Sequence, residues 1–170
     1  MSRTTSLTIE NSIFEKLQVK ESVIILAFSV FIPFLIHFVP VSGNPAGAVL
    51  LPIFIAPFIA VLFFRLNVAL LTALVSPILN FLLTGNPVYG IVGIITLELV
   101  LFVIISRLLI KIDYLKYVAA PVGVIFSMFV TQLFFSPVNN FTSVLKTGLP
   151  GIILISILNI LYLTSFKKSK

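Results

Sequence analysis

The chain has 170 residues, of which 59% are hydrophobic and only 9% charged, with a formal net charge of +6. Soluble domains carry about 25% charged residues, so this composition excludes an ordinary soluble protein and predicts one that crosses a membrane several times. The chain contains no cysteine, which excludes disulfides, thiolate metal sites and cysteine nucleophiles. Its basic residues do not cluster with aromatic residues, so we attribute the positive charge to orientation in the membrane and expect no nucleic-acid partner.

A helix needs about 20 apolar residues to cross a hydrocarbon core of ~30 Å. The sequence therefore predicts an all-α integral membrane protein, a compact bundle of six transmembrane helices within residues 22–164. The expected spans are Ser22–Val39, Ala48–Phe64, Val68–Leu83, Val88–Ile110, Tyr117–Phe135 and Leu149–Thr164. Prolines inside the second and third spans predict a shaped interior, because neighbouring helices or a cavity must satisfy the carbonyls that proline frees.

Charge segregation predicts the orientation. Ten of the eleven basic residues fall on one side of the six-span arrangement, and Lys146 alone falls on the other. Under the positive-inside rule both termini are cytoplasmic (N-in and C-in), and five or seven spans would spoil the segregation. We expect residues 1–21 to form a cytoplasmic N-terminal segment and residues 165–170 a basic cytoplasmic tail. Within the former, Ile9–Glu21 suits either a short amphipathic helix on the membrane surface or a solvated tail.

The connections on the opposite side differ in kind from the short cytoplasmic turns. They are Pro40–Gly47, Thr84–Pro87 and Ser136–Gly148, rich in Gly, Pro, Asn and Ser and almost without charge. This contrast predicts a ligand site that faces outward.

Glu98 is the strongest candidate for a site residue, because ionisable groups at membrane depth are expensive and usually functional. It lies about 15 Å along its helix from the outer boundary, at ~1.5 Å per residue. It could accept hydrogen bonds from a ligand at the floor of a pocket. Alternatively, it could be a neutral structural group bonded to Asn80 or Gln132 on a neighbouring helix.

Further polar and aromatic residues lie toward the outer ends of the spans or in the outer loops. With Glu98, the candidate substrate-binding residues are His37, Asn44, Asn80, Asn86, Tyr89, Gln132 and Asn139. His37 could equally cap its helix, and a lone histidine without cysteine builds no convincing metal site, so we expect neither metal nor cofactor. Asn159, deeper in the sixth span, is better interpreted as a group that hydrogen-bonds between helices.

Catalytic signatures are missing from the sequence. It has no Gly-x-Ser-x-Gly elbow, no His-Glu-x-x-His pair and no phosphate-binding loop. Beyond the N-terminal segment the carboxylates are Glu98 and Asp113, which the six-span arrangement puts on different sides of the membrane. We therefore expect a binding protein and not an enzyme.

A series of different short motifs runs through most of the chain, from about Ile32 to Leu161. They are Leu51-Pro52, Pro57, Ser76-Pro77, Leu82–Pro87, Leu97–Leu99 and Gly148–Gly151, with His37 ahead of Pro40 and Gly43. Their order and spacing resemble the substrate-binding S components of energy-coupling factor (ECF) transporters. The resemblance implies six helices and a pocket near the outer face, roofed by the loops after the first, third and fifth spans.

The resemblance also implies a function and partners. An S component in the lipid of a bacterial or archaeal plasma membrane captures a vitamin or related micronutrient. It delivers this molecule through a transmembrane T component driven by two cytoplasmic ATPases. The chain departs from the family pattern at Phe31, where an Ala-x-x-x-Ala motif is common, and at Ile53 and Asn86, where methionine is usual. The substrate is therefore left open among a flavin, a pterin, a pantothenate-like acid and a corrinoid.

Two other functions fit six spans with a basic inner side. One is a membrane scaffold subunit of the cell-shape or cell-wall machinery, and the other is a small proton-coupled carrier that uses Glu98 as a relay. A scaffold needs neither a carboxyl group at membrane depth nor outer asparagines. A carrier would need more than one charged group inside the membrane. Both considerations favour substrate capture.

Overall fold

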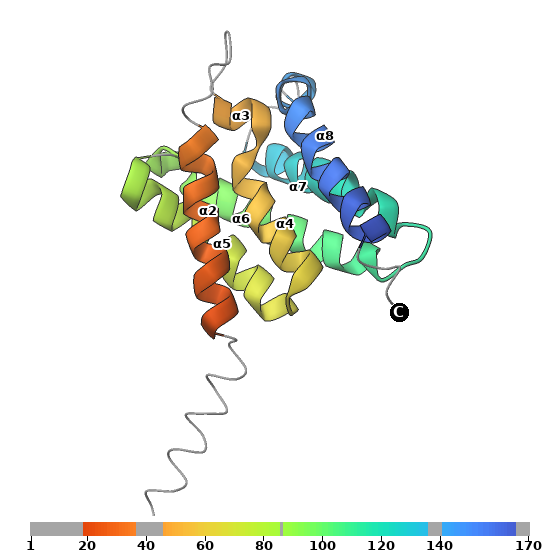
Figure 1. Ribbon diagram of the computed structural model, residues 1–170. Coiled ribbons are helices and arrows are strands. Elements are labelled where there is room, and N and C mark those ends of the chain that lie inside the picture. The colour runs from red at the N-terminus through yellow and green to blue at the C-terminus, as the bar shows by residue number, and fades with distance from the viewer. Residues whose placement is uncertain (1–18, 37–45, 86, 136–140, 166–170) are drawn as a thin grey trace, which may run out of the picture.

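The structure, a computed structural model, describes residues 19–36, 46–85, 87–135 and 141–165. Over these residues the chain is helical and contains no strand (Figure 1). Six of its helical segments are long and apolar enough to cross a membrane, which confirms the predicted all-helical, six-span fold. The elements in chain order are α2 (Val19–Ile36), α3 (Ala46–Leu50), α4 (Pro52–Phe63), α5 (Leu66–Thr84), α6 (Tyr89–Ile110), the 3₁₀ helix η1 (Lys116–Val118), α7 (Ala119–Phe135) and α8 (Phe141–Ser165).

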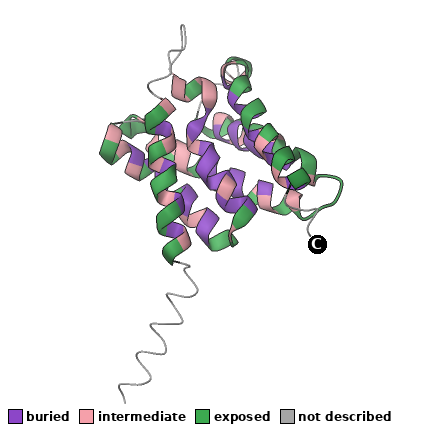
Figure 2. Cartoon of the chain, viewed as in Figure 1, coloured by how far each residue is buried: buried purple, intermediate pink, exposed green. Residues whose placement is uncertain are grey.

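Helix α4 is the centre of the bundle. Nine of its twelve residues are buried, and it contacts α2, α5, α6 and α8. In Figure 2 the buried residues run along α4 and the inner faces of its neighbours. The ring of Phe102 on α6 lies 5.2 Å from that of Phe54 and 5.8 Å from that of Phe58, between centroids. Close packing of this kind holds helices together in a membrane. Lipid is as apolar as the protein interior, so the hydrophobic effect does not drive the helices together there.

The second predicted span is interrupted, because Leu51 separates α3 from α4 with a left-handed backbone (φ +47°). Pro52 then opens α4, a position where the missing N–H of proline is tolerated. For the same reason Pro52 cannot donate to the carbonyl of Ala48, four residues earlier. A leucine held in the left-handed region costs of order 1–3 kcal/mol and persists only where surrounding contacts enforce it.

Helix α8 supplies those contacts. A Cβ atom added at Gly151 would lie 2.6 Å from the carbonyl carbon of Leu50 and 2.8 Å from Cβ of Leu51. Glycine is therefore required for the two backbones to approach so closely. One turn earlier, a Cβ at Gly148 would lie 3.3 Å from Cδ1 of Leu51, which is itself 7% exposed. The Gly148–Gly151 motif thus positions the break between α3 and α4.

The proline inside α2 is compensated by a side chain of α5. Pro33 has no N–H for the carbonyl of Ser29, four residues earlier. Asn80 donates from Nδ2 to that carbonyl at 2.8 Å, and also to the carbonyl of Ser76 in its own helix at 2.8 Å. A neighbouring helix thus satisfies the carbonyl that proline frees.

Helix α8 begins earlier than predicted. The sequence places Ser136–Gly148 in an outer loop, but Phe141–Gly148 form the first turns of the helix. Phe141 and Leu145, one turn apart, pack against the core, and the ring of Phe141 lies 5.4 Å from that of Phe129. In the sequence, polar residues separate these apolar ones, so the apolar face of the helix is not apparent. The remaining described ends agree with the predicted spans to within about three residues.

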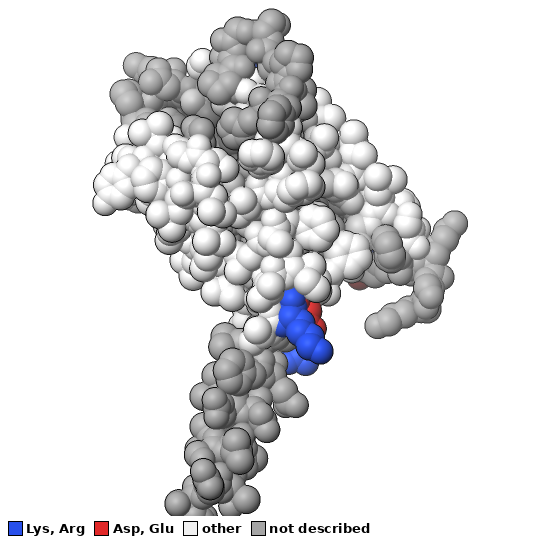
Figure 3. Space-filling view, turned by 60° about the vertical axis from the view of Figure 1, so that its left-hand side comes forward, with Lys and Arg blue, Asp and Glu red and all other residues white. Residues whose placement is uncertain are grey.

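Polar contacts tie the helices together at the end of the bundle where α4 and α6 finish. Arg107 of α6 donates from Nη1 to the carbonyl of Val61 near the end of α4, where a cation also suits the helix dipole. Fully buried Asn159 of α8 donates to the carbonyls of Lys116 and Tyr117 at 2.9 and 3.0 Å. The predicted interhelical role of Asn159 is confirmed. On the face shown in Figure 3, charged side chains gather toward the lower part, and the rest of the described surface is uncharged.

Candidate functional site

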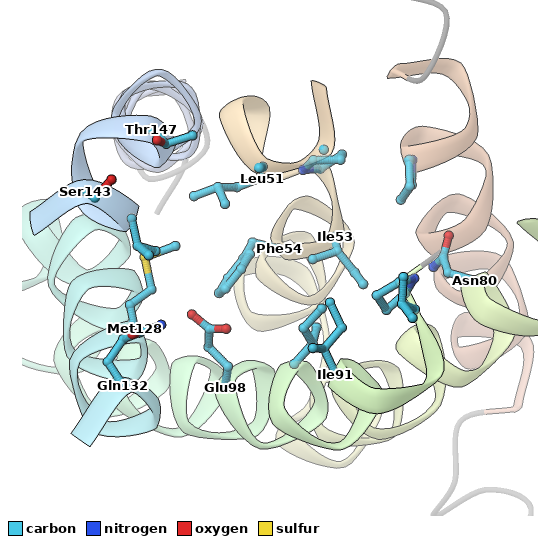
Figure 4. Close-up of a pocket in the computed structure, with 18 residues that line it drawn as sticks. Leu51, Ile53, Phe54, Asn80, Ile91, Glu98, Met128, Gln132, Ser143 and Thr147 are labelled. Carbon is cyan, nitrogen blue, oxygen red and sulfur yellow. The ribbon is translucent and has the colours of Figure 1, made fainter. Parts of the chain in front are cut away.

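A cavity of about 520 Å³ lies inside the bundle, toward the end at which α3, α6 and α8 begin. This volume is within the range of roughly 300–1,000 Å³ that is usual for ligand pockets. All six spans contribute to the lining, which is mostly apolar (Figure 4). Among the described residues, its polar side chains are Asn80, Glu98, Gln132, Ser143 and Thr147.

The apolar walls are fixed by contacts made outside the cavity. Phe54 is 2% exposed and packs edge-on against Phe102. Leu51 is held at the helix break by the close approach of Gly151. The shape of the cavity therefore follows from helix packing.

Glu98 lies near the middle of α6, on the face that also carries Ile91 and Ile95 into the lining. Figure 4 shows its carboxyl group projecting toward Phe54, with Gln132 of α7 to one side. Within the described part of the chain, this carboxyl group makes no hydrogen bond to Asn80 or Gln132. Among the described residues, the interhelical hydrogen bond that was the alternative role for Glu98 is thus absent, and its carboxyl group is available to another molecule.

Gln132 adds an amide beside Glu98. Its Oε1 atom is buried and has no hydrogen-bond partner among the described residues. A buried acceptor left unsatisfied costs about 1–3 kcal/mol. A ligand or water molecule in the cavity would recover this cost.

Asn80 lies at the far side of the cavity, beyond Ile53 and Ile91 in Figure 4. It is 2% exposed, and both hydrogens of its Nδ2 group are used by backbone carbonyls. Its Oδ1 atom is buried without a partner in the described structure. Asn80 can therefore offer no N–H donor to a bound molecule.

The structure brings three of the predicted site residues into one lining: Asn80, Glu98 and Gln132. Tyr89 lies apart from them. It is 77% exposed, its ring centroid is 5.7 Å from that of Phe81, and the neighbouring Val88 and Ile91 take the cavity face of this first turn. The other predicted residues lie outside the described part of the chain: His37, Asn44, Asn86 and Asn139.

Sequence reasoning missed the cavity residues Met128, Ser143 and Thr147. Met128 precedes Gln132 by one helical turn, and Ser143 precedes Thr147 by the same distance. The four-residue spacings were available as a signal. That signal points to the cavity only once Phe141–Gly148 are known to be helical.

The described lining residues suit binding. They supply one carboxyl group, two amides and two hydroxyl groups, with no Lys, Arg or His. No group of three or more His, Cys, Asp or Glu residues that could hold a metal ion occurs in the ranges that the structure covers. What these groups can do together is hydrogen-bond a molecule held between apolar walls.

Comparison with protein-family models, curated proteins and solved structures finds no match for the chain. The function must therefore be argued from its own residues.

Proposed function

We propose that this protein is the substrate-capture (S) subunit of an ECF-type importer and binds a vitamin or related micronutrient among its six helices. The observation that carries the proposal is the cavity of about 520 Å³, which Glu98 and two amide side chains line together with apolar walls. Apolar walls cover the body of a ligand, while a few fixed polar groups orient it. The motif resemblance supports the same function.

The unpartnered polar atoms strengthen this proposal. Buried polar groups in proteins are nearly always hydrogen-bonded, so each exception requires an explanation. Of the four buried side-chain oxygens without a partner in the described structure, those of Asn80 and Gln132 belong to side chains that line this cavity, whereas those of Ser76 and Asn159 do not. A bound molecule with a complementary group explains the Gln132 amide, which is free to turn toward the cavity.

The proposal extends to orientation and partners. The charge distribution favours an orientation with both termini in the cytoplasm of a bacterial or archaeal cell, which turns the cavity end outward. The sequence has no phosphate-binding loop, so energy for import comes from partners. These are a T component in the membrane and two cytoplasmic ATPases, and the protein itself is not an enzyme.

The two alternative functions are less well supported. A membrane scaffold has no use for a cavity with unpartnered amides. A proton-coupled carrier would pass protons between several ionisable groups, whereas Glu98 is the lone ionisable side chain in the described lining.

The test is binding by the purified full chain in detergent or nanodiscs, screened against a vitamin panel by native mass spectrometry and thermal shift. We expect one micronutrient to bind with one molecule per chain. Glu98→Gln should weaken binding at least tenfold. Thr96→Val is the matched control, because the Thr96 hydroxyl bonds the Val92 carbonyl at 2.8 Å and does not line the cavity.

A different result of this test would favour the scaffold function over substrate capture. That result is a failure of every compound to bind, together with stable co-purification of cell-wall proteins.

A further inference from the structure

Hydrogen-bond acceptors dominate the polar groups around the cavity. Glu98 offers two carboxyl oxygens, and the buried amide oxygens of Asn80 and Gln132 have no partner in the described residues. Asn80 offers no donor in return, because its two hydrogens are bonded to the carbonyls of Ser29 and Ser76.

Backbone carbonyls add to this excess. Ala48 and Ile53 both line the cavity. In an uninterrupted helix the carbonyl of each would accept from the N–H four residues later. Those positions are Pro52 and Pro57, which have no N–H. The helix break and the proline in α4 thus leave two carbonyl groups of lining residues without their usual helical N–H donors.

Side-chain donors are fewer on the same surface. The described lining provides the amide nitrogen of Gln132 and the hydroxyl groups of Ser143 and Thr147, and a hydroxyl group can donate or accept. Lys146 is exposed and lies outside the lining. Within the described lining, a carboxylate or phosphate placed beside Glu98 would find no Lys, Arg or His to pair with it, and an unpaired buried charge is strongly unfavourable.

We infer that the cavity selects a compound that is uncharged or cationic and presents N–H groups to Glu98 and Gln132, with no carboxylate or phosphate beside these two side chains. This inference rests on the proposed capture function and narrows its substrate class. Flat rings with amide or amino groups, of the flavin or pterin kind, satisfy the acceptors. A pantothenate-like acid does not.

Matched pairs of compounds test the inference with the full chain in nanodiscs. The pairs are pterin with pterin-6-carboxylate and panthenol with pantothenate; thiamine serves as a cation. In each pair that binds, the uncharged member should half-saturate the protein at a concentration at least tenfold lower than that of the acid. Glu98→Gln should narrow this ratio at least fivefold, whereas Thr96→Val should preserve it. Gln132→Leu provides an independent variant that should weaken the uncharged member.

The outcomes separate this inference from the proposed function. Tighter binding of the acids by the wild-type protein overturns the inference and leaves substrate capture standing. An unchanged ratio in Glu98→Gln, with unchanged affinity in Gln132→Leu, overturns the assignment of these side chains. If no compound in the pairs or in the full vitamin panel binds, both the inference and the capture function fail.

Discussion

Replacing Gly151 by alanine tests whether the contact between α8 and the helix break builds the cavity. The added Cβ would lie 2.6 Å from the carbonyl carbon of Leu50, 2.7 Å from its oxygen and 2.8 Å from Cβ of Leu51, whereas ordinary contact begins at 3.4 Å. These are backbone and near-backbone atoms that no rotamer change can move. One helix must therefore shift by roughly 0.8 Å, the difference between 3.4 and 2.6 Å.

The expected loss follows from two opposing effects. Overpacking of a well-packed interior costs about 1–3 kcal/mol, and a backbone clash falls toward the upper end of that range. Alanine in place of glycine returns up to about 1 kcal/mol of helix propensity. We expect a net loss of about 1–2 kcal/mol for Gly151→Ala. Gly93→Ala is the control, because Gly93 is also helical and nothing lies within 4 Å of its added Cβ.

The assay is thermal unfolding in detergent, monitored by size-exclusion chromatography, and ligand affinity is measured in parallel. A change of 1 kcal/mol shifts Tm by about 2–4 °C for a chain of this size, so Gly151→Ala should lower Tm by roughly 2–8 °C. Affinity should fall as well, because Leu51 lines the cavity. If the Gly151→Ala and Gly93→Ala variants have the same Tm and the same ligand affinity, this reasoning is wrong.

Three further predictions follow from single contacts. Asn80→Leu should cost about 1–3 kcal/mol, and less in a Pro33→Ala background, where α2 recovers its own N–H donor; equal costs in the two backgrounds would refute the repair. Asn159→Leu should lower Tm through loss of two bonds to carbonyls but leave ligand affinity unchanged, and a coupled loss of affinity would contradict this separation. Because the chain has no cysteine, single Tyr89→Cys and Tyr114→Cys variants report topology, and both positions are exposed. An impermeant maleimide should label the former in intact cells and the latter only after lysis, and the reverse pattern would invert the proposed orientation.

Much of the fold is predictable because it depends on properties of single segments. Apolar length determines where helices can span a membrane, and the described span ends follow it closely. Three residues of the cavity lining were predictable for a related reason. Polar side chains at membrane depth are costly unless they face the protein interior, and Asn80, Glu98 and Gln132 do so.

The rest depends on contacts between segments distant in sequence. No local signal marks Leu51 for a left-handed conformation, which is held by Gly151 of α8, far along the chain. The early start of α8 depends likewise on the packing of Phe141 against Phe129. Tyr89 lies outside the cavity lining because its side chain packs beside Phe81, an arrangement that the span pattern does not determine.

The prolines differ in what satisfies the carbonyls they free, and this difference can be tested. The carbonyl freed by Pro33 has a donor in Asn80, whereas the carbonyl of Ile53, freed by Pro57, belongs to a residue of the cavity lining. Pro57→Ala restores the missing N–H inside α4. It should therefore leave Tm unchanged or raised, while the affinity for an N–H-bearing ligand falls several-fold. If Pro57 served packing alone, the substitution would lower Tm and affinity together. Opposite changes in stability and affinity are thus expected only where a proline keeps an acceptor available for the ligand.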